Sequence, residues 1–284
     1  MDTARGAAVS AADFGLKGPR GWAFRGIGFT AEPGSLIAVE GPSGSGRTSL
    51  LLALTGRMRA TEGSATVDRS RLPKQLAAVR RISALGPVPG VTDLDPSLTV
   101  AEHLRERALL ERRFTGSLRG LLRPPGERAA ASRLRVDAAL RAAGLDVEAL
   151  PKGPRTSVRD LDRLEALRLS VALALIGRPR LLGVDDTDLK LSDAERAFAW
   201  DLLRSIAASG TTVVAVCSEA PEGAVVVPTG TRDGTRDGAL RDVRKNDARG
   251  DTQDDARGDT QDDARAGTDD DKEAADAVAE AGRA

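Results

Sequence analysis

A glycine-rich nonapeptide, GPSGSGRTS at 41–49, constrains the fold of this chain more than any other stretch. It directly follows the apolar run SLIAVE at 35–40 and leads into TSLLLALTGR at 48–57, whose leucines recur at helical spacing. A short apolar run that ends at glycine is typical of a buried strand, and the leucine spacing indicates a helix. The sequence therefore predicts a strand, a tight loop and a helix in immediate succession, which is a building block of α/β folds.

The glycines of this loop make its backbone suitable for binding phosphate. Gly41, Gly44 and Gly46 allow successive N–H groups to turn inward, and the following helix presents its positive dipole end. The stretch resembles the phosphate-binding loop G-x-x-x-x-G-K-[S/T], whose last hydroxyl, here Thr48, lies where Mg²⁺ bridges the phosphates. The residues predicted to bind the nucleotide are Gly41, Pro42, Ser43, Gly44, Ser45, Gly46, Arg47, Thr48 and Ser49.

Arg47 stands where that motif has lysine. Arginine keeps a positive charge near the β and γ phosphates but replaces a compact ammonium with a longer, planar group. Nucleotide binding should therefore survive the exchange. The catalytic role that we assign to Arg47 is the neutralisation of phosphate charge. A displaced charge that stabilises the ground state as much as the transition state would add nothing to turnover.

Two aspartates end a second apolar run, RPRLLGVDD at 178–186. The run is typical of a buried strand, and open α/β sheets bind their ligands beyond the carboxyl ends of the strands. We expect Asp185, together with Thr48, to bind Mg²⁺. We expect Asp186 to be the catalytic residue that orients the attacking water.

Another βα unit follows these aspartates. TTVVAVCS at 211–218 is typical of a buried strand, and Ser192 with Glu195 has capping-box spacing before a helix. The apolar stripe expected on that helix is Phe198, Leu202 and Ile206. The pattern continues the α/β core beyond the two aspartates.

The middle of the chain, from about 97 to 168, has wholly helical patterns. Thr99 and Glu102 have the spacing of a second capping box, and RVDAALRAAGL at 135–145 repeats its apolar positions every three or four residues. The arginines between 105 and 135 are interspersed with glutamates, which favours a solvated surface over a basic patch for lipid or nucleic acid.

Composition excludes several classes of function. Aromatic residues make up 2% of the chain and tyrosine is absent, so stacking platforms for nucleic acid are nearly excluded and we expect no nucleic-acid partner. One cysteine, Cys217, and one histidine, His103, exclude an internal disulfide and a Cys/His zinc cluster. No apolar run has the roughly 18 residues of a membrane-spanning helix, and the first residues lack the apolar stretch of a signal peptide, so we expect a soluble, cytoplasmic protein.

These motifs together resemble the nucleotide-binding subunit of the ATP-binding cassette (ABC) transporters. The resemblance covers roughly 11–227 and rests on EPGSLIAVEGPSGSGRTSLLLALTGR, DPSLTVAEHL and VALALIGRPRLLGVDD. It implies a phosphate-loop NTPase α/β core, of the RecA-like kind, with an inserted α-helical subdomain. It also implies ATP and Mg²⁺ as cofactors, a second cassette bound head to tail in a homo- or heterodimer, and an integral membrane permease-type subunit as partner. The expected location is therefore peripheral, at the inner face of the cell membrane.

The sequence departs from the family pattern at four places. The family signature LSGGQ falls on LDRLE at 161–165, so a carboxylate replaces the hydroxyl that the family places against the γ-phosphate of the opposite cassette. The usual histidine falls on Ser218, the glutamine-bearing loop falls near Gly86 without a glutamine, and the catalytic glutamate becomes Asp186. Trp22 is the nearest candidate for stacking on adenine, although a packing role is the stronger interpretation of this residue.

The chain is expected to fall into three parts. They are a flexible N-terminus at 1–10, an ABC-type ATP-binding domain at 11–228, and a low-complexity acidic tail at 229–284. The domain is divided into a core at 11–96 and 169–228, and a helical subdomain with the signature region at about 97–168. The tail has 16 acidic and 10 basic residues, a balance of −6, so with 42 of each sign in the whole chain the remainder carries +6. Its near repeat DARGDTQD has almost no large apolar residue, which predicts disorder. The alternative is an interaction tail that docks on a basic surface.

Three functional hypotheses follow. The first is a slow but active ATPase subunit of an ABC-type transport or membrane-remodelling system. The second is a nucleotide-binding module with little turnover, in which ATP reversibly clamps a partner. The third, a guanine-nucleotide switch, is disfavoured because the chain lacks an N-K-x-D element.

Overall fold

The structure is a computed structural model that describes residues 6–114, 124–187 and 191–230. All of these residues belong to one compact unit. The predicted tail lies outside the described residues from 231 onward, so its predicted disorder stays a prediction.

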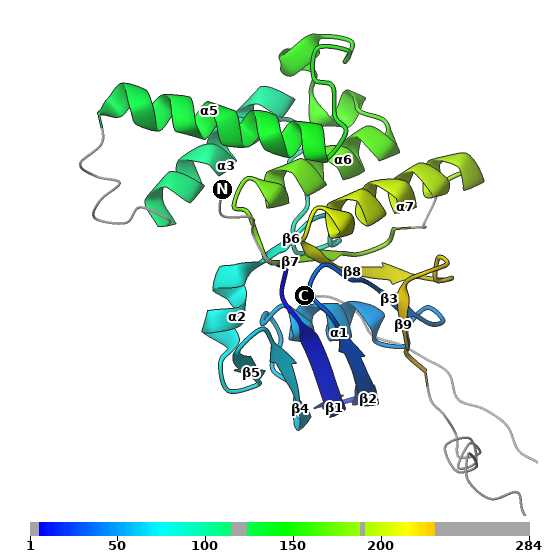
Figure 1. Ribbon diagram of the computed structural model, residues 1–284. Coiled ribbons are helices and arrows are strands. Elements are labelled where there is room, and N and C mark those ends of the chain that lie inside the picture. Colours follow the sequence, from blue (N-terminus) through cyan, green and yellow to red (C-terminus); the bar gives the residue numbers. More distant parts are fainter. Residues whose placement is uncertain (1–5, 115–123, 188–190, 231–284) are drawn as a thin grey trace, which may run out of the picture. The chain divides into compact units, whose positions relative to one another are not determined.

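A parallel sheet of five strands forms the centre of the fold (Figure 1). Its strands run in the order β6 (Ser83–Leu85), β7 (Leu181–Val184), β8 (Thr212–Cys217), β3 (Leu36–Glu40) and β9 (Val225–Pro228). The predicted strands at 35–40, 178–186 and 211–218 are thus confirmed, and all three are neighbours in this sheet. Every residue of β7 and β8 is buried, as expected for parallel strands that are covered on both faces.

A second, antiparallel sheet packs on one side of the central sheet. Its strands are ordered β2 (Gly21–Ala31), β1 (Val9–Gly18), β4 (Glu62–Val67) and β5 (Ser70–Leu72). Helix α1 (Arg47–Leu54) lies between the two sheets, where Leu50, Leu51 and Leu54 join one core with residues of both (Figure 1). The helix predicted after the glycine-rich loop is therefore confirmed, and these three leucines are fully buried, whereas Leu52 is partly buried.

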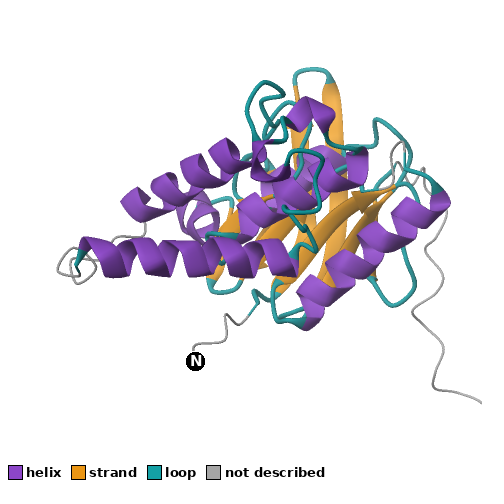
Figure 2. Cartoon of the chain, turned by 90° about the horizontal axis from the view of Figure 1, so that it is seen from above, coloured by secondary structure: helices purple, strands orange, loops and turns teal. Residues whose placement is uncertain are grey.

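Helices cover the opposite face of the central sheet (Figure 2). Helices α6 (Arg163–Leu175) and α7 (Asp193–Ala208) share a core with the central strands, and α3 (Val100–Phe114) and α5 (Pro125–Ala142) pack with α6 in a further cluster. Helix α2 (Leu76–Ile82) precedes β6. Among the described helices, none is long and apolar enough to cross a membrane.

Both predicted capping boxes are present. The Thr99 N–H donates to Glu102 Oε2 over 2.8 Å at the start of α3, and the Ser192 N–H donates to Glu195 Oε2 over 2.8 Å at the start of α7. Each box satisfies backbone donors that have no partner inside the helix.

Three predictions about local structure are wrong. The middle region is not wholly helical, because turns and the short 3₁₀ helices Gly153–Arg155 and Val158–Asp160 occupy most of 143–162, a stretch that contains prolines and left-handed glycines. Phe198 does not belong to the buried stripe of α7, since it is 58% exposed and the buried face is formed by Ala199, Trp200, Leu203, Ile206 and Ala207.

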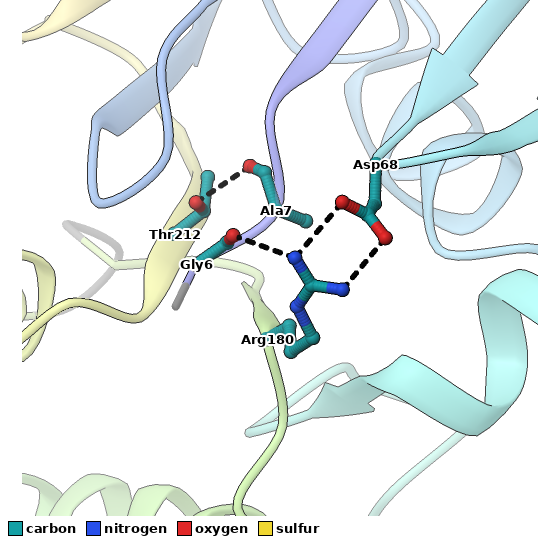
Figure 3. A network of polar contacts seen from close by, with 5 residues as sticks. All are labelled: Gly6, Ala7, Asp68, Arg180 and Thr212. Atoms are coloured by element: carbon teal, nitrogen blue, oxygen red, sulfur yellow. Dashed lines mark hydrogen bonds and ion pairs between the residues drawn. The ribbon is translucent and has the colours of Figure 1, made fainter. Parts of the chain in front are cut away.

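The third wrong prediction is the flexible N-terminus, which fails for residues 6–10. Ala7 is fully buried, and Thr212 Oγ1 donates to its carbonyl oxygen over 2.7 Å. Arg180 donates to Gly6 O and makes a two-pronged ion pair with Asp68, at 2.6 and 2.8 Å (Figure 3). These hydrogen bonds connect the residues just before β1 to both sheets.

Candidate functional site

The glycine-rich loop connects β3 to α1 and is held from two sides by backbone. Gly46 caps α1 with a φ of 85°, and a Cβ at this position would lie 1.8 Å from the carbonyl oxygen of Ala23 in β2. A Cβ at Gly41 would lie 2.2 Å from the carbonyl oxygen of Thr229. At both positions the backbone of another segment leaves no room for a Cβ atom, so only glycine fits.

The middle of the loop is open. The Ser45 N–H donates to the Pro42 carbonyl over 3.2 Å, which closes a turn. Gly44 has a φ of 80°, and a Cβ there would meet no atom of the described residues within 4 Å. The loop therefore presents an accessible turn directly before the N-terminus of α1, which is the arrangement that binds phosphate groups.

Thr48 and Asp185 meet at the end of the loop although they are far apart in the sequence. Thr48, in the first turn of α1, donates from Oγ1 to Asp185 Oδ2 over 2.7 Å. Asp185 directly follows β7 and is 3% exposed. Burial raises the pKa of Asp185, and the nearby Asp186 charge adds to this, while the hydrogen bond from Thr48 and the charge of Arg47 act in the opposite direction.

This oxygen pair fits a magnesium ion. Mg²⁺ prefers hard oxygen ligands and is commonly bound by one or two protein oxygens together with phosphate oxygens. A hydroxyl and a desolvated carboxylate at hydrogen-bond distance, next to a phosphate-binding turn, supply that donor set. A divalent cation would also relieve the cost of the buried carboxylate charge.

Asp186 lies beside this pair in an unusual backbone conformation. Its φ is 49°, in the left-handed region that aspartate adopts at a cost, and its N–H donates to Asp185 Oδ1 over 3.0 Å. Asp185, Asp186 and Arg163 line one cavity of about 230 Å³, together with Pro87. The structure therefore brings both predicted carboxylates and one residue of the signature segment together.

Arg47 is held by the neighbouring strand. Its guanidinium Nη1 donates to the carbonyl oxygen of Cys217, the last residue of β8, over 2.6 Å. Cys217 itself is a buried strand residue, as predicted. Because arginine has five N–H donors, Arg47 retains donors for phosphate while it stays bound to this carbonyl.

The signature segment forms an ordinary helix cap. Asp162 Oδ1 accepts the Glu165 N–H over 2.7 Å, and Glu165 Oε2 accepts the Asp162 N–H over 2.9 Å. Helix α6 thus begins with two carboxylates that already bind two of the N–H groups at its start. The two carboxylates place negative charge at this end of the helix, which disfavours a phosphate from a second molecule, whereas Arg163 at the first helical position carries the opposite charge.

The other departures from the family pattern lie near the carboxyl end of the central sheet or beside the phosphate loop. Gly86 donates its N–H to Gly183 O over 2.7 Å, and the loop that follows it is tied by Thr92. Ser218 directly follows β8. Trp22 is 37% exposed and lines a cavity of about 540 Å³ beside the phosphate loop, with the Lys17 ammonium 5.6 Å from its ring centroid.

Sequence reasoning missed two residues that shape the loop. Ala23 approaches Gly46 from β2, and Thr229 contacts both Gly41 and Ser45. The composition of the chain placed Thr229 in the tail, whereas the structure buries it to 5% exposure. Neither residue type carries a chemical signal, and only the fold reveals their proximity to the loop.

Known proteins resemble this chain in sequence and in fold. A family model described as ABC transporter matches residues 24–188. Nod factor export ATP-binding protein I of Cupriavidus pinatubonensis (strain JMP 134 / LMG 1197) is 33% identical over 181 residues, which are 64% of this chain and 49% of that protein. ABC transporter G family member 13 of Arabidopsis thaliana is 28% identical over 192 residues, 66% of this chain and 26% of that protein. The chain thus spans about half, or less, of the length of these curated relatives.

Solved structures show the same fold. The ATP-binding cassette MJ0796, in a dimeric post-hydrolysis state bound to ADP and Pi, superposes with a TM-score of 0.57 at 22% identity, over 74% of this chain and 88% of that one. For cbiO1 from Clostridium perfringens, part of the ABC transporter complex cbiONQ, the TM-score is 0.58 at 18% identity, over 74% and 78% of the two chains. The expected phosphate-loop NTPase α/β fold is confirmed. The family model matches more than half of the residues, and the chain therefore belongs to the ABC transporter family, as a nucleotide-binding subunit.

Proposed function

We propose that this chain is the ATP-binding and ATP-hydrolysing subunit of an ABC-type transporter, acting from the cytoplasmic face of the membrane on a separate membrane partner. The observation that carries the proposal is the 2.7 Å contact between Thr48 and Asp185 at the end of the phosphate-binding loop. A glycine-rich turn binds phosphate in many proteins, but a hydroxyl and a buried carboxylate beside it suit phosphate together with Mg²⁺.

Each residue of the site has a defined task in this proposal. The loop amides bind the phosphates, Thr48 and Asp185 hold Mg²⁺, and the guanidinium of Arg47 neutralises phosphate charge. The bound metal would supply electrostatic stabilisation of the charge that develops on the transferred phosphoryl group. Asp186 accepts a hydrogen bond from the attacking water and orients it.

A nucleotide-dependent clamp with little turnover is the second candidate. It is favoured by the start of α6, where Asp162 and Glu165 occupy two of the N–H groups that would otherwise be open to an anion. Asp186 is also one methylene shorter than glutamate, and a misplacement of about 1 Å can cost about 10²-fold in rate. In a heterodimer, a second cassette with an unaltered signature would supply the missing contacts to the nucleotide held here.

The membrane partner is proposed to dock on a large cavity between the core and the helical part of the chain. This cavity, of about 1000 Å³, is lined by the core residues Arg57 and Arg80 and by Arg107 and Leu173 of the helical part. Burial, and the charges of Arg80 and Arg107, lower the pKa of Arg57 to about 10. Within this cavity Arg107 already pairs with Glu111 at 2.6 Å, so a partner segment that carries a carboxylate would act on Arg57 and Arg80. Its movement would reach both parts of the chain.

Phosphate release separates the two candidates. In the ATPase proposal, Asp186→Asn lowers the rate of phosphate release by about 10²-fold or more and leaves a more slowly dissociating Mg·ATP complex, because the water is no longer activated. Asp201→Asn, on the exposed face of α7, is the matched control and should leave the rate unchanged. Equal release from the wild-type chain and Asp186→Asn would exclude hydrolysis at this site and leave the clamp.

A further inference from the structure

Thr229 lies where the central sheet meets the phosphate loop. It directly follows β9, and its N–H donates to the carbonyl oxygen of Glu40 over 2.7 Å. Glu40 is the last residue of β3, immediately before the loop begins at Gly41. Thr229 therefore continues the pairing of β9 with β3 up to the first residue of the loop.

The hydroxyl of Thr229 joins two points of the phosphate loop. Its Oγ1 donates to Glu40 O over 3.0 Å and lies 2.7 Å from Ser45 Oγ. A hydroxyl has one proton, and the Thr229 proton points to the Glu40 carbonyl. Ser45 is therefore the donor in the second bond, and the chain of hydrogen bonds runs from Ser45 through Thr229 to Glu40.

This chain of hydrogen bonds restrains the loop between its entry and its middle. Glu40 precedes the first glycine, and Ser45 directly precedes the glycine that caps α1. The Ser45 side chain is hydrogen-bonded to Thr229, and the Ser45 N–H is hydrogen-bonded to the Pro42 carbonyl. The loop segment from Pro42 to Ser45 therefore has little conformational freedom left. Ordering a flexible segment opposes binding, so a loop that is already restrained before the nucleotide arrives binds it more tightly.

We propose that Thr229 is a positioning residue of the nucleotide site, which acts through Ser45 to hold the phosphate loop in its binding conformation. The proposal rests on the proposed function, because it concerns affinity for Mg·ATP at that loop. Within the part of the chain that the structure describes, the hydrogen bonds of Thr229 reach Glu40 and Ser45, and neither the metal pair nor the carboxylate of Asp186. Its removal should therefore weaken nucleotide binding without slowing the chemical step at saturating nucleotide.

The decisive variant is Thr229→Val, which removes the hydroxyl and keeps both the side-chain volume and the backbone bond to Glu40. Its Kd for Mg·ATP, from isothermal titration calorimetry on the full chain, should rise about tenfold, with kcat within about twofold of wild type. Thr229→Ser should restore a Kd within about threefold of wild type, because it retains the hydroxyl. The control is Thr212→Val: Thr212 is equally buried, bonds Ala7 and Gly34, and lies outside the loop (Figure 3). It should lower the melting temperature and leave the Kd unchanged.

A double-mutant cycle tests the route through Ser45. Ser45→Ala should raise the Kd by a similar factor, and the double variant with Thr229→Val should bind no more weakly than either single variant. An unchanged Kd in both single variants, an equal rise in Thr212→Val, or additive losses in the double variant would each overturn the proposal. A wild-type chain that fails to bind Mg·ATP would instead remove the proposed function itself. If Thr229→Val does not fold, Thr229→Ala, which also removes the hydroxyl, replaces it in both tests.

Discussion

Gly46→Ala should be the most damaging single-methyl change in the phosphate loop. A non-glycine residue in the left-handed region costs about 1–2 kcal/mol. The added Cβ would also lie 1.8 Å from the Ala23 carbonyl oxygen, and an ordinary contact of 3.4 Å requires that distance to grow by 1.6 Å. Ala23 lies in β2, which is paired with β1 on either side of it, so the loop must move instead. Overpacking adds about 1–3 kcal/mol, for a total loss of about 2–5 kcal/mol in the free energy of unfolding.

Gly44→Ala is the matched control for this change. Gly44 has nearly the same φ, 80° against 85°, but a Cβ added there would meet no atom of the described residues within 4 Å. It should lose only the conformational part, about 1–2 kcal/mol. Urea unfolding without nucleotide measures both variants, and Mg·ATP titration should show a higher Kd for Gly46→Ala than for Gly44→Ala, since only the former displaces the loop. Equal unfolding free energies in the two variants would refute the role assigned to the close approach of β2.

Two further predictions concern charge. Asp185→Asn should abolish Mg²⁺-dependent nucleotide binding but raise the melting temperature of the metal-free chain. Because burial raises the folded-state pKa of Asp185, the contribution of this carboxyl to stability falls as pH rises from its unfolded pKa of about 4 through its higher folded-state pKa. The advantage of the variant in melting temperature should therefore grow over that rise in pH, and a difference that does not change with pH would contradict the prediction. Arg180→Met removes the two-pronged ion pair with half-buried Asp68 and should lower the free energy of unfolding in urea by about 1.5–3 kcal/mol. The Kd for Mg·ATP should not change. A loss below about 0.5 kcal/mol would show that the pair contributes no more than an exposed ion pair.

The parts of the site that follow from local chemistry could be predicted from the sequence. The apolar run before Gly41 and the leucines after Thr48 each carry their own period, so strand, loop and helix were recognisable one by one. The pairing of Thr48 with Asp185 followed from a general rule, since parallel strands place their carboxyl ends at one edge of the sheet.

The contacts that restrain the loop could not be predicted in the same way. Ala23 acts through its backbone carbonyl and Thr229 through one hydroxyl, and neither leaves a pattern in the sequence. The error at Phe198 has a similar origin, because a stripe at helical spacing defines a face but not which of two neighbouring faces meets the sheet. The error over 143–162 came from extending one periodic segment past residues that favour turns.

The starts of α1 and α6 differ in how strongly the fold constrains them. At the start of α1, both flanking glycines are in backbone contact with other segments of the fold, so substitution there would displace the loop and lower the free energy of unfolding. At the start of α6, the carboxylates of Asp162 and Glu165 bind each other's backbone N–H, and substitution there would leave the sheets untouched. The glycines of the loop are thus required by the stability of the fold, whereas the carboxylates at the start of α6 can be exchanged for another helix cap without a close backbone contact being lost.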